Sequence, residues 1–100
     1  MGKFKVEIFP AAKSDLLEMI EYLNTLSPEV AIKQYDSIIN KVSTLTEMPQ
    51  RCPLLKTNEL RQKGYRTFFI DNYIVFYVIK DNVVEIRRIL YGKRQYEFLL

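Results

Sequence analysis

The sequence predicts an α+β fold, in which an antiparallel sheet of about four strands packs on an N-terminal αα-hairpin. Three observations lead to this class. The chain of 100 residues has the usual size of a single domain. Its first half contains two stretches in which apolar residues recur with helical spacing, and its last third contains three short stretches rich in β-branched and aromatic residues. We therefore expect the order β-α-α-β-β-β and then a basic C-terminal tail, in one domain over residues 1–100.

An alternating stretch opens the chain. Residues 3–9 place apolar side chains on one face and charged side chains on the other, which is typical of a half-buried strand. The apolar positions are Phe4, Val6 and Ile8. Pro10 should end this strand because proline has no backbone N–H to offer to a sheet.

Two helices joined by a short turn should follow. Helical spacing runs from Ser14 to about Leu26, and acidic side chains near its start suit the positive end of the helix dipole. They are Asp15, Glu18 and Glu21. Ser27-Pro28 has the residue types of an N-cap and a first helical position, and Met48-Pro49 should stop the second helix. Its apolar seam is expected at Ala31, Tyr35, Ile38, Val42 and Leu45.

The rest of the sheet should occupy the end of the chain. Residues 46–58 contain two prolines and are expected to form a long loop, after which residues 59–61 begin the sheet. The strands are expected at Tyr65–Ile70, Tyr73–Lys80 and Val83–Leu90. Asp71-Asn72 and Asp81-Asn82 should form the tight turns between them, since Asp and Asn tolerate left-handed backbone conformations.

The strand Tyr73–Lys80 carries apolar side chains on both of its faces. Either the sheet is covered on both sides, or one face is an exposed apolar site that awaits a partner. We favour the exposed face, and we expect a partner to bind it together with the basic surface nearby.

The charge of the chain is divided unevenly. Residues 1–50 carry five Lys against seven Asp and Glu, a net charge of −2, whereas residues 51–100 carry ten Lys and Arg against five Asp and Glu, a net charge of +5. A basic half suggests an anionic partner, either nucleic acid or an acidic protein segment, although a solvated basic surface would look the same. No apolar run approaches a membrane span and no signal-peptide pattern opens the chain, so we expect no membrane partner.

Several kinds of chemistry are excluded by residues that the chain lacks. It contains no histidine, which excludes Ser-His-Asp and Cys-His hydrolysis and disfavours a zinc site. Three glycines cannot form a Gly-rich phosphate loop. Cys52 is the single cysteine, so no internal disulfide forms and a reducing, cytoplasmic location is expected. We expect neither a metal nor a cofactor.

Arginines, lysines and tyrosines lie along and just beyond the expected sheet. Arginine forks bind phosphates or carboxylates, and tyrosine rings can stack on bases. These candidate surface residues are Arg61, Lys63, Arg66, Arg87, Arg88, Lys93 and Arg94, with Tyr65, Tyr91 and Tyr96 between them. Arg87 and Arg88 are neighbours on a strand, so they should point to opposite faces unless a bulge intervenes. One that faced the core would need a carboxylate such as Asp36, in a structural salt bridge.

The order and spacing of several short motifs resemble the toxins of RelE/ParE-type type II toxin–antitoxin systems. The likeness covers nearly the whole chain. It rests on Ala12, Asp15-Leu16, Leu45, Pro49, Leu60-Arg61, Gly64-Tyr65-Arg66, residues 72–77, Val84-Glu85-Ile86 and residues 89–94. The resemblance implies a small sheet packed on a helical hairpin, in agreement with the pattern above.

Within that family, the RelE-like members are ribosome-dependent ribonucleases that cut messenger RNA, and the ParE-like members poison DNA gyrase. The ribonuclease interpretation would make Arg66, Arg94 and Tyr96 catalytic. Three departures weigh against it. Ile74 stands where the ribonucleases carry an important arginine, Leu100 falls near the place of their C-terminal tyrosine, and Tyr91 replaces a frequent histidine. We therefore favour a ParE-like toxin over the ribonuclease, and a non-toxic nucleic-acid-binding domain is the third interpretation.

The resemblance also implies the partners. They are a cognate antitoxin, the target (DNA gyrase or the ribosome with its message), and operator DNA through the antitoxin alone. The residues expected to bind the target or nucleic acid are Arg61, Arg66, Arg88, Tyr91, Lys93, Arg94 and Tyr96. The helical hairpin is expected to be structural.

Overall fold

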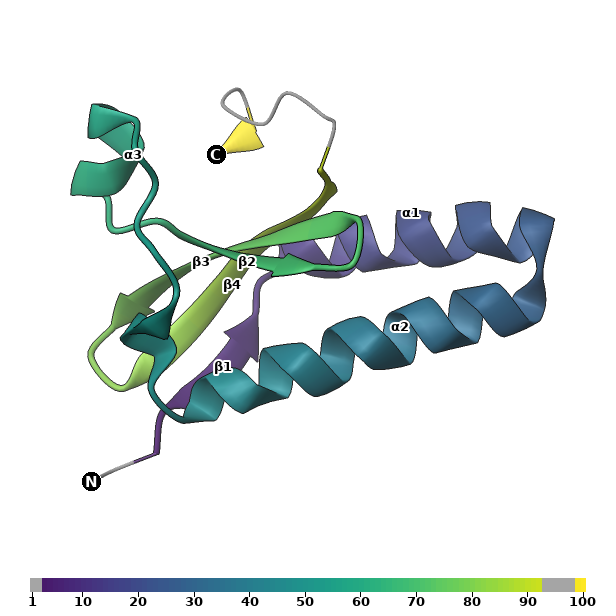
Figure 1. Cartoon of the computed structure of the whole chain (residues 1–100), viewed down its shortest axis with the longest axis horizontal. Coiled ribbons are helices and arrows are strands. Elements are labelled where there is room, and N and C mark those ends of the chain that lie inside the picture. The colour runs from purple at the N-terminus through teal and green to yellow at the C-terminus, as the bar shows by residue number, and fades with distance from the viewer. Residues whose placement is uncertain (1–2, 93–98) are drawn as a thin grey trace.

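The computed structural model describes residues 3–92 and 99–100, and it joins a long helical hairpin to a four-stranded sheet (Figure 1). The predicted α+β fold is confirmed. The helices are α1 (Pro10–Leu26), α2 (Pro28–Ser43) and the short α3 (Asn58–Gln62). The strands are β1 (Lys5–Ile8), β2 (Arg66–Ile70), β3 (Tyr73–Lys80) and β4 (Val83–Tyr91), and two 3₁₀ turns lie at Thr44–Thr46 and Pro49–Arg51.

The sheet is mixed, with the strand order β1-β4-β3-β2. The last three strands are antiparallel because two-residue turns join them, and Asp71 and Asp81 adopt the expected left-handed conformation with φ of 55° each. The expectation of a wholly antiparallel sheet is wrong for β1, which runs parallel to β4. Parallel neighbours need a long crossover connection, and β1 and β4 are separated in the chain by all the helices and by β2 and β3.

Helix α1 begins four residues earlier than the sequence suggested. Pro10 ends β1, but it is also the first residue of α1, where the missing N–H of proline is harmless. The first turn therefore holds no acidic residue, and the expected dipole role of Asp15 is wrong. The second helix begins as predicted, with the Ser27 hydroxyl accepting a hydrogen bond from the Val30 N–H at 3.4 Å.

The two long helices cover one face of the sheet, which we call the helix face. Its core joins side chains of α1 and α2 to the inward side of all four strands. The fully buried members include Ile38, Leu45, Val75, Tyr77, Val84 and Ile86. Two expectations about α2 are wrong. Tyr35 is 38% exposed at the edge of the seam, and the helix ends at Ser43, well before Pro49, because the chain tightens into a 3₁₀ turn that buries Leu45.

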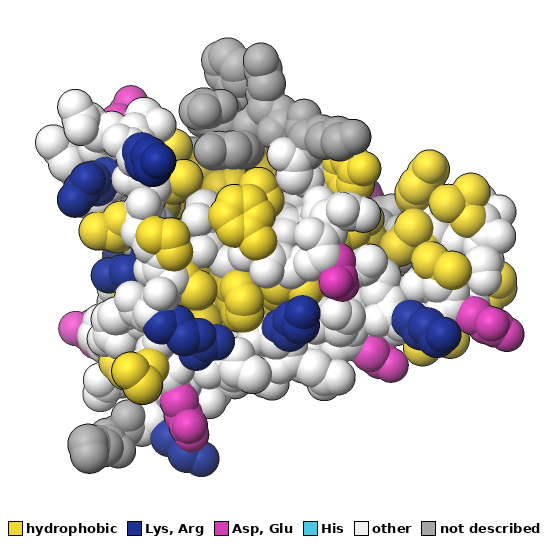
Figure 2. Space-filling model, in the orientation of Figure 1, with side chains coloured by type: hydrophobic (Ala, Val, Ile, Leu, Met, Phe, Trp, Pro, Cys, Tyr) yellow, Lys and Arg dark blue, Asp and Glu magenta, His cyan; other side chains and the backbone are white. Residues whose placement is uncertain are grey.

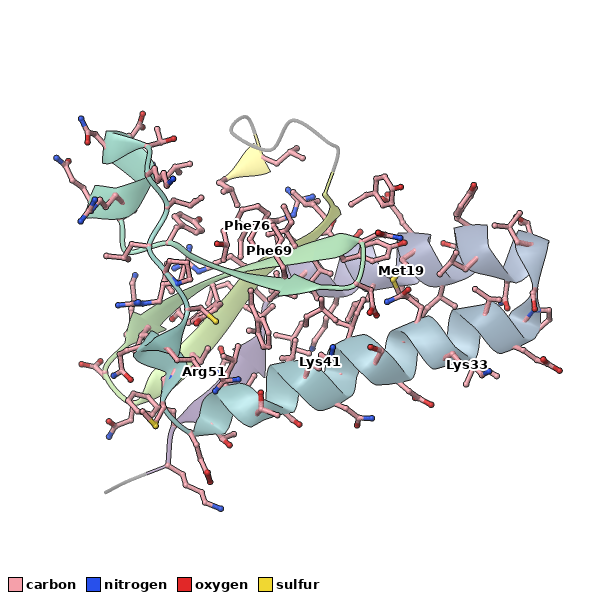
Figure 3. The ribbon with its side chains drawn as sticks, in the orientation of Figure 1. Met19, Lys33, Lys41, Arg51, Phe69 and Phe76 are labelled. Carbon is pink, nitrogen blue, oxygen red and sulfur yellow. The ribbon has the colours of Figure 1, made fainter. Side chains whose placement is uncertain are left out.

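The other side of the sheet, which we call the far face, is also covered. Ile74 is 6% exposed and Phe76 is 0% exposed, so the prediction of an open apolar face is wrong. Figure 3 labels Phe76 on the side of the sheet where the C-terminal residues lie. The cover comes from irregular chain, namely Leu55, Leu60 and Tyr65 with the partly buried Leu99 and Leu100.

A folded loop explains how this cover forms. The stretch around residue 60 belongs to α3 and not to the sheet, and α3 ends where Gly64 has a φ of +85° and its N–H donates to the Arg61 carbonyl. The loop before α3 then turns back along β2, because the Thr67 N–H donates to the Pro53 carbonyl at 3.2 Å. Within the part of the chain that is described, no helix has the length and apolar character needed to cross a membrane.

Candidate functional site

A bulge in β4 decides where the two neighbouring arginines lie. Phe76 lies opposite Arg88 and Tyr77 lies opposite Ile86, so Arg87 has no partner residue on β3. Both arginines border one hollow of about 270 Å³ beside the start of α1. The simple alternation that would send them to opposite faces does not hold at this point.

Arg88 makes a partly buried ion pair with Asp15 of α1. Its Nε and Nη2 donate to the two oxygens of the carboxylate at 2.7 and 2.8 Å, and Nη1 donates to the Leu99 carbonyl at 3.2 Å. The hydrogen bonds to Asp15 raise the pKa of Arg88. Arg88 therefore makes the structural salt bridge that the sequence analysis expected for one of the two arginines. Its partner is Asp15, whereas Asp36 had been expected.

Arg87 is engaged in a different way. Its Nη2 donates to Glu85 at 2.7 Å, and its guanidinium lies 4.9 Å from the centre of the Phe9 ring. The second ring near it belongs to Tyr65, at 6.0 Å. Tyr65 is itself buried on the far face, so it cannot present its ring to a base in this structure.

The other predicted contact residues do not gather at one place. Arg66 lies on β2 and donates from Nη1 to the Gln50 and Cys52 carbonyls at 3.1 and 2.6 Å, which fastens the loop around Pro49. Arg61 is exposed on α3. Tyr91 is 45% exposed at the end of β4, at the opposite end of the strands from Arg66. Lys93, Arg94 and Tyr96 lie outside the described residues.

A larger hollow, which the sequence did not predict, lies between α1, the first turns of α2 and the ends of β3 and β4. It has a volume of about 670 Å³, and we call it the helix–edge hollow. Its lining comprises Asp15, Glu18, Met19, Tyr22, Leu23, Val30, Gln34, Asn72, Tyr73, Ile89, Leu90 and Tyr91. Figure 3 shows Met19 pointing from α1 toward α2 and the end of the sheet.

Large apolar side chains remain exposed around this hollow. Tyr22 is 63% exposed and Val30 is 47% exposed. Figure 2 shows hydrophobic side chains gathered on the end of the helical hairpin that extends beyond the sheet. Tyr73 contacts the ring of Tyr91 edge-on at 5.7 Å between centroids, and partial burial raises the pKa of Tyr73. The Tyr73 phenol therefore stays a neutral hydrogen-bonding group near neutral pH.

Two charged residues among those that the structure describes line the helix–edge hollow, and both are acidic. The carboxylate of Asp15 is occupied by Arg88 and by the Ile89 N–H at 2.9 Å. Glu18 is exposed, and its charge acts on Arg88 without a direct ion-pair contact among the described residues. Among the described residues, no group of His, Cys, Asp and Glu is arranged to hold a metal ion.

One sequence signal could have revealed this hollow. The apolar stripe of α1 continues through Tyr22 and Leu26, wider than a single core-facing stripe needs. Such a second stripe indicates that the helix has another neighbour or an open apolar side. The position of the hollow, however, depends on how far β1 extends along β4, which the alternation in residues 3–9 does not set.

Comparisons with known proteins agree on one group. A family model described as "ParE toxin of type II toxin-antitoxin system, parDE" matches residues 6–96. A solved structure described as the chromosomal ParDE TA system from P. aeruginosa is similar, with a TM-score of 0.75 and 21% identity over 89% of this chain and 96% of that chain. At that identity the likeness is evidence of the fold. No curated protein sequence matches.

Proposed function

The chain belongs to the ParE toxin family of type II toxin–antitoxin systems, and from this premise we propose that it inhibits growth by poisoning DNA gyrase and that a cognate antitoxin neutralises it. The family match carries the proposal, because it extends from β1 through the end of β4. In this proposal, operator DNA is bound through the antitoxin, and the toxin itself needs no metal or cofactor.

Two features of the structure favour gyrase over messenger RNA as the target. Ile74, at the place where ribonuclease relatives carry an arginine, is buried in the far-face core, so no cation reaches a phosphate from there. Arg66 already donates to two backbone carbonyls, and it would have to leave both to bind a scissile phosphate. Two of the groups on which a ribosome-dependent ribonuclease would depend are thus absent or occupied.

The candidate contacts with gyrase are the exposed cations and rings of the basic half. Arg61 and Tyr91 are the exposed members among the described residues, whereas Arg66 and Arg88 are partly buried and hydrogen-bonded within the fold. We propose Arg61 and Tyr91 as contacts, with Lys93, Arg94 and Tyr96 beside them in sequence. An exposed arginine would act through Coulomb attraction, so its contribution should weaken as salt is added.

The test is induced expression of the chain. Primer extension is then run on message from the induced cells, and the purified chain is added to a gyrase supercoiling assay. We expect growth arrest, loss of DNA supercoiling by purified gyrase when the toxin is added, and no cuts in message detected by primer extension. Codon-positioned cuts with normal supercoiling would replace gyrase poisoning with the ribonuclease activity. Ile38→Asp serves as the control, because a charge in the helix-face core abolishes the fold while the message is still made.

The same experiment examines the antitoxin. The product of the small open reading frame beside the toxin gene should restore growth when it is co-expressed. Arrest that no neighbouring product relieves would count against a two-protein module. Absence of arrest from a folded, well-expressed chain would favour the non-toxic nucleic-acid-binding domain.

A further inference from the structure

We propose that residues 47–51, which we call the Met48 loop, form a preorganised contact surface for the target, in which the Met48 side chain enters an apolar pocket on gyrase. This inference rests on the proposed function, since it adds an apolar contact to the exposed contacts named for that target. No residue of this loop was expected as a contact from the sequence.

The first observation is the exposure of Met48. Its exposed fraction is 73%, the highest among the large apolar side chains that the structure describes. Most of the other exposed apolar side chains lie on the helical hairpin, whereas Met48 follows the 3₁₀ turn Thr44–Thr46 and precedes the buried Pro49. Methionine is enriched in protein interfaces, because its flexible thioether adapts to an irregular pocket. Met48 is therefore a candidate anchor for a partner.

The second observation is backbone strain at the same residue. Met48 has a φ of 50° and a ψ of 54°, in the left-handed region that residues other than glycine rarely adopt. The proline that follows disfavours this conformation further, because it pushes the preceding residue toward an extended backbone. Such a conformation persists only where the surrounding structure enforces it, and strained residues of this kind cluster at functional contacts. Here it separates an outward Met48 from a fully buried Pro49.

Side chains of the sheet enforce this conformation from below. The Tyr77 hydroxyl donates to the Pro49 carbonyl at 2.6 Å, and Arg66 Nη1 donates to the Gln50 carbonyl at 3.1 Å. Tyr77 lies on β3 and Arg66 on β2, so two neighbouring strands hold the loop.

Arg51 closes the loop from its other end. Its Nη1 donates to the Glu47 carbonyl at 2.8 Å, and its backbone N–H donates to the Met48 carbonyl at 3.1 Å. Figure 3 shows Arg51 at the end of α2 that lies away from the turn between α1 and α2. Every carbonyl from residue 47 to residue 50 thus accepts a hydrogen bond. A loop held in this way loses little conformational entropy when a partner binds.

The charge of the Met48 loop indicates the class of partner. Its two charged side chains, Glu47 and Arg51, are exposed and have opposite signs. A loop without net charge gains little from a phosphate backbone, whose binding depends on cations, whereas an exposed methionine gains from an apolar pocket on a protein. Lys5 and Lys41 lie near the base of the loop and would attract either class of partner, so salt dependence must separate their contribution.

The place of the loop in the chain indicates gyrase as that protein. The loop and α3 belong to one irregular stretch between α2 and β2, and α3 carries the exposed Arg61 that is proposed to contact gyrase. Figure 1 shows this stretch along the end of the molecule that lies away from the turn between α1 and α2. Met48 and Arg61 therefore border one continuous surface.

A glycine substitution separates contact from folding. Met48→Gly removes the side chain and accepts the left-handed backbone without strain. We expect this variant to need at least about tenfold more protein than the wild type to stop supercoiling by purified gyrase, because burial of one methionine side chain contributes about one to two orders of magnitude in affinity. Its melting temperature should equal or exceed that of the wild type.

Two variants serve as controls in the same assay. Met48→Leu keeps a large apolar side chain and should inhibit gyrase within about twofold of the wild type. Ile32→Ala removes a side chain that is 61% exposed on α2, outside the loop, and should inhibit as the wild type does. Equal inhibition by folded Met48→Gly and the wild type would overturn the contact. A lower melting temperature of Met48→Gly would overturn it too, because the side chain would then stabilise the chain itself.

Binding measured by surface plasmon resonance at low and high salt checks the class of partner. The surfaces carry gyrase, duplex DNA alone, or the growth-restoring neighbouring protein. We expect Met48→Gly to lose affinity for gyrase alone, by the same factor at both salt concentrations, because salt does not screen an apolar contact. Arg61→Ala gives the contrast, since its loss should shrink as salt is added. A comparable loss by Met48→Gly toward DNA or the neighbouring protein, or a loss that shrinks with salt, would overturn the apolar contact with gyrase.

The two levels of inference fail in different ways. If the wild type does not stop supercoiling, gyrase poisoning itself is wrong and the loop inference falls with it. If the wild type stops supercoiling and Met48→Gly does so equally well, only the loop inference is wrong.

Discussion

The two faces of the sheet are buried to a similar degree and are covered in different ways. On the helix face, two long helices place side chains at regular intervals over Val75 and Tyr77. On the far face, Ile74 and Phe76 are covered by a loop that contains one short helix, and by two C-terminal residues. Helices that cover a sheet have apolar residues at helical spacing, which can be recognised in the sequence, whereas a covering loop has no such periodicity. The far face therefore looked open from the sequence although it is closed.

The largest effect should come from Asp15, which connects the two faces. Asp15 belongs to the helix that covers one face, and its partner Arg88 holds the Leu99 carbonyl on the other. Asp15→Ala should lower the free energy of unfolding by about 3–5 kcal/mol, because it leaves the partly buried guanidinium without its carboxylate. Urea unfolding at neutral pH measures it, with Glu18→Ala as an exposed control on the same helix. Similar losses for both variants would show that Asp15 does not link the faces.

Truncating a buried side chain on the helix face should strongly lower the free energy of unfolding. Ile38→Ala should cost roughly 2–5 kcal/mol, because Ile38 is fully buried and the rigid helices around it cannot collapse into the cavity. Ile32→Ala on the same helix is the matched control, since Ile32 is 61% exposed and its loss should be near zero. Thermal denaturation compares them. Loss of toxicity by Ile38→Ala with an unchanged melting curve would contradict the structural role of the hairpin.

The far face should tolerate the same change better. Leu60→Ala removes a buried side chain from α3, and we expect a loss of about 2 kcal/mol, at the low end of the range for such truncations, because an irregular cover can settle into the space. Chemical denaturation beside Ile38→Ala gives the comparison directly. A loss at Leu60 larger than that at Ile38 would mean that the loop packs as rigidly as the helices.

A small, pH-dependent effect should appear at Tyr77 on the helix face. Its hydroxyl donates to the Pro49 carbonyl at 2.6 Å, and burial raises the pKa of Tyr77. The folded chain keeps this proton where the unfolded chain releases it, so the stability it contributes is present below about pH 10 and is lost as the pH rises further. Tyr77→Phe should cost about 1 kcal/mol at pH 7 and should flatten the alkaline decline. Melting curves from pH 7 to 11 measure the stability at neutral pH and its fall at alkaline pH. If the stability of Tyr77→Phe falls as steeply with pH as that of the wild type, groups other than Tyr77 cause the fall.

Much of the fold was predictable because local chemistry determines it. The bounds of β3 agree residue for residue with the expectation, and Ser27 caps α2 as its residue type suggests. The errors occurred where one residue has two roles or where tertiary contacts decide. Pro10 ends a strand and starts a helix, so α1 was expected to begin too late. Leu60 was assigned to a strand although Gly64 closes a helical turn after it.

The candidate site was less predictable than the fold. Arginines can be recognised in a sequence, but their hydrogen-bond partners cannot, and Arg88 and Arg66 turned out to be engaged within the chain. The helix–edge hollow arises from a difference in strand length, which appears only once the strands are paired. Exposed Arg61 and Tyr91 remain the predicted contacts with the target, together with the positions that follow Gly92.

The shortness of β1 also offers a route to redesign. Four residues of β1 accompany the nine residues of β4, and the difference leaves the edge at Tyr91 with no strand beside it among the described residues. A β1 extended by a few residues before Pro10 would run along that edge and accept a hydrogen bond from the Tyr91 N–H. Such a chain would close its own sheet edge, and it should resist the edge-to-edge pairing that an unpaired strand invites.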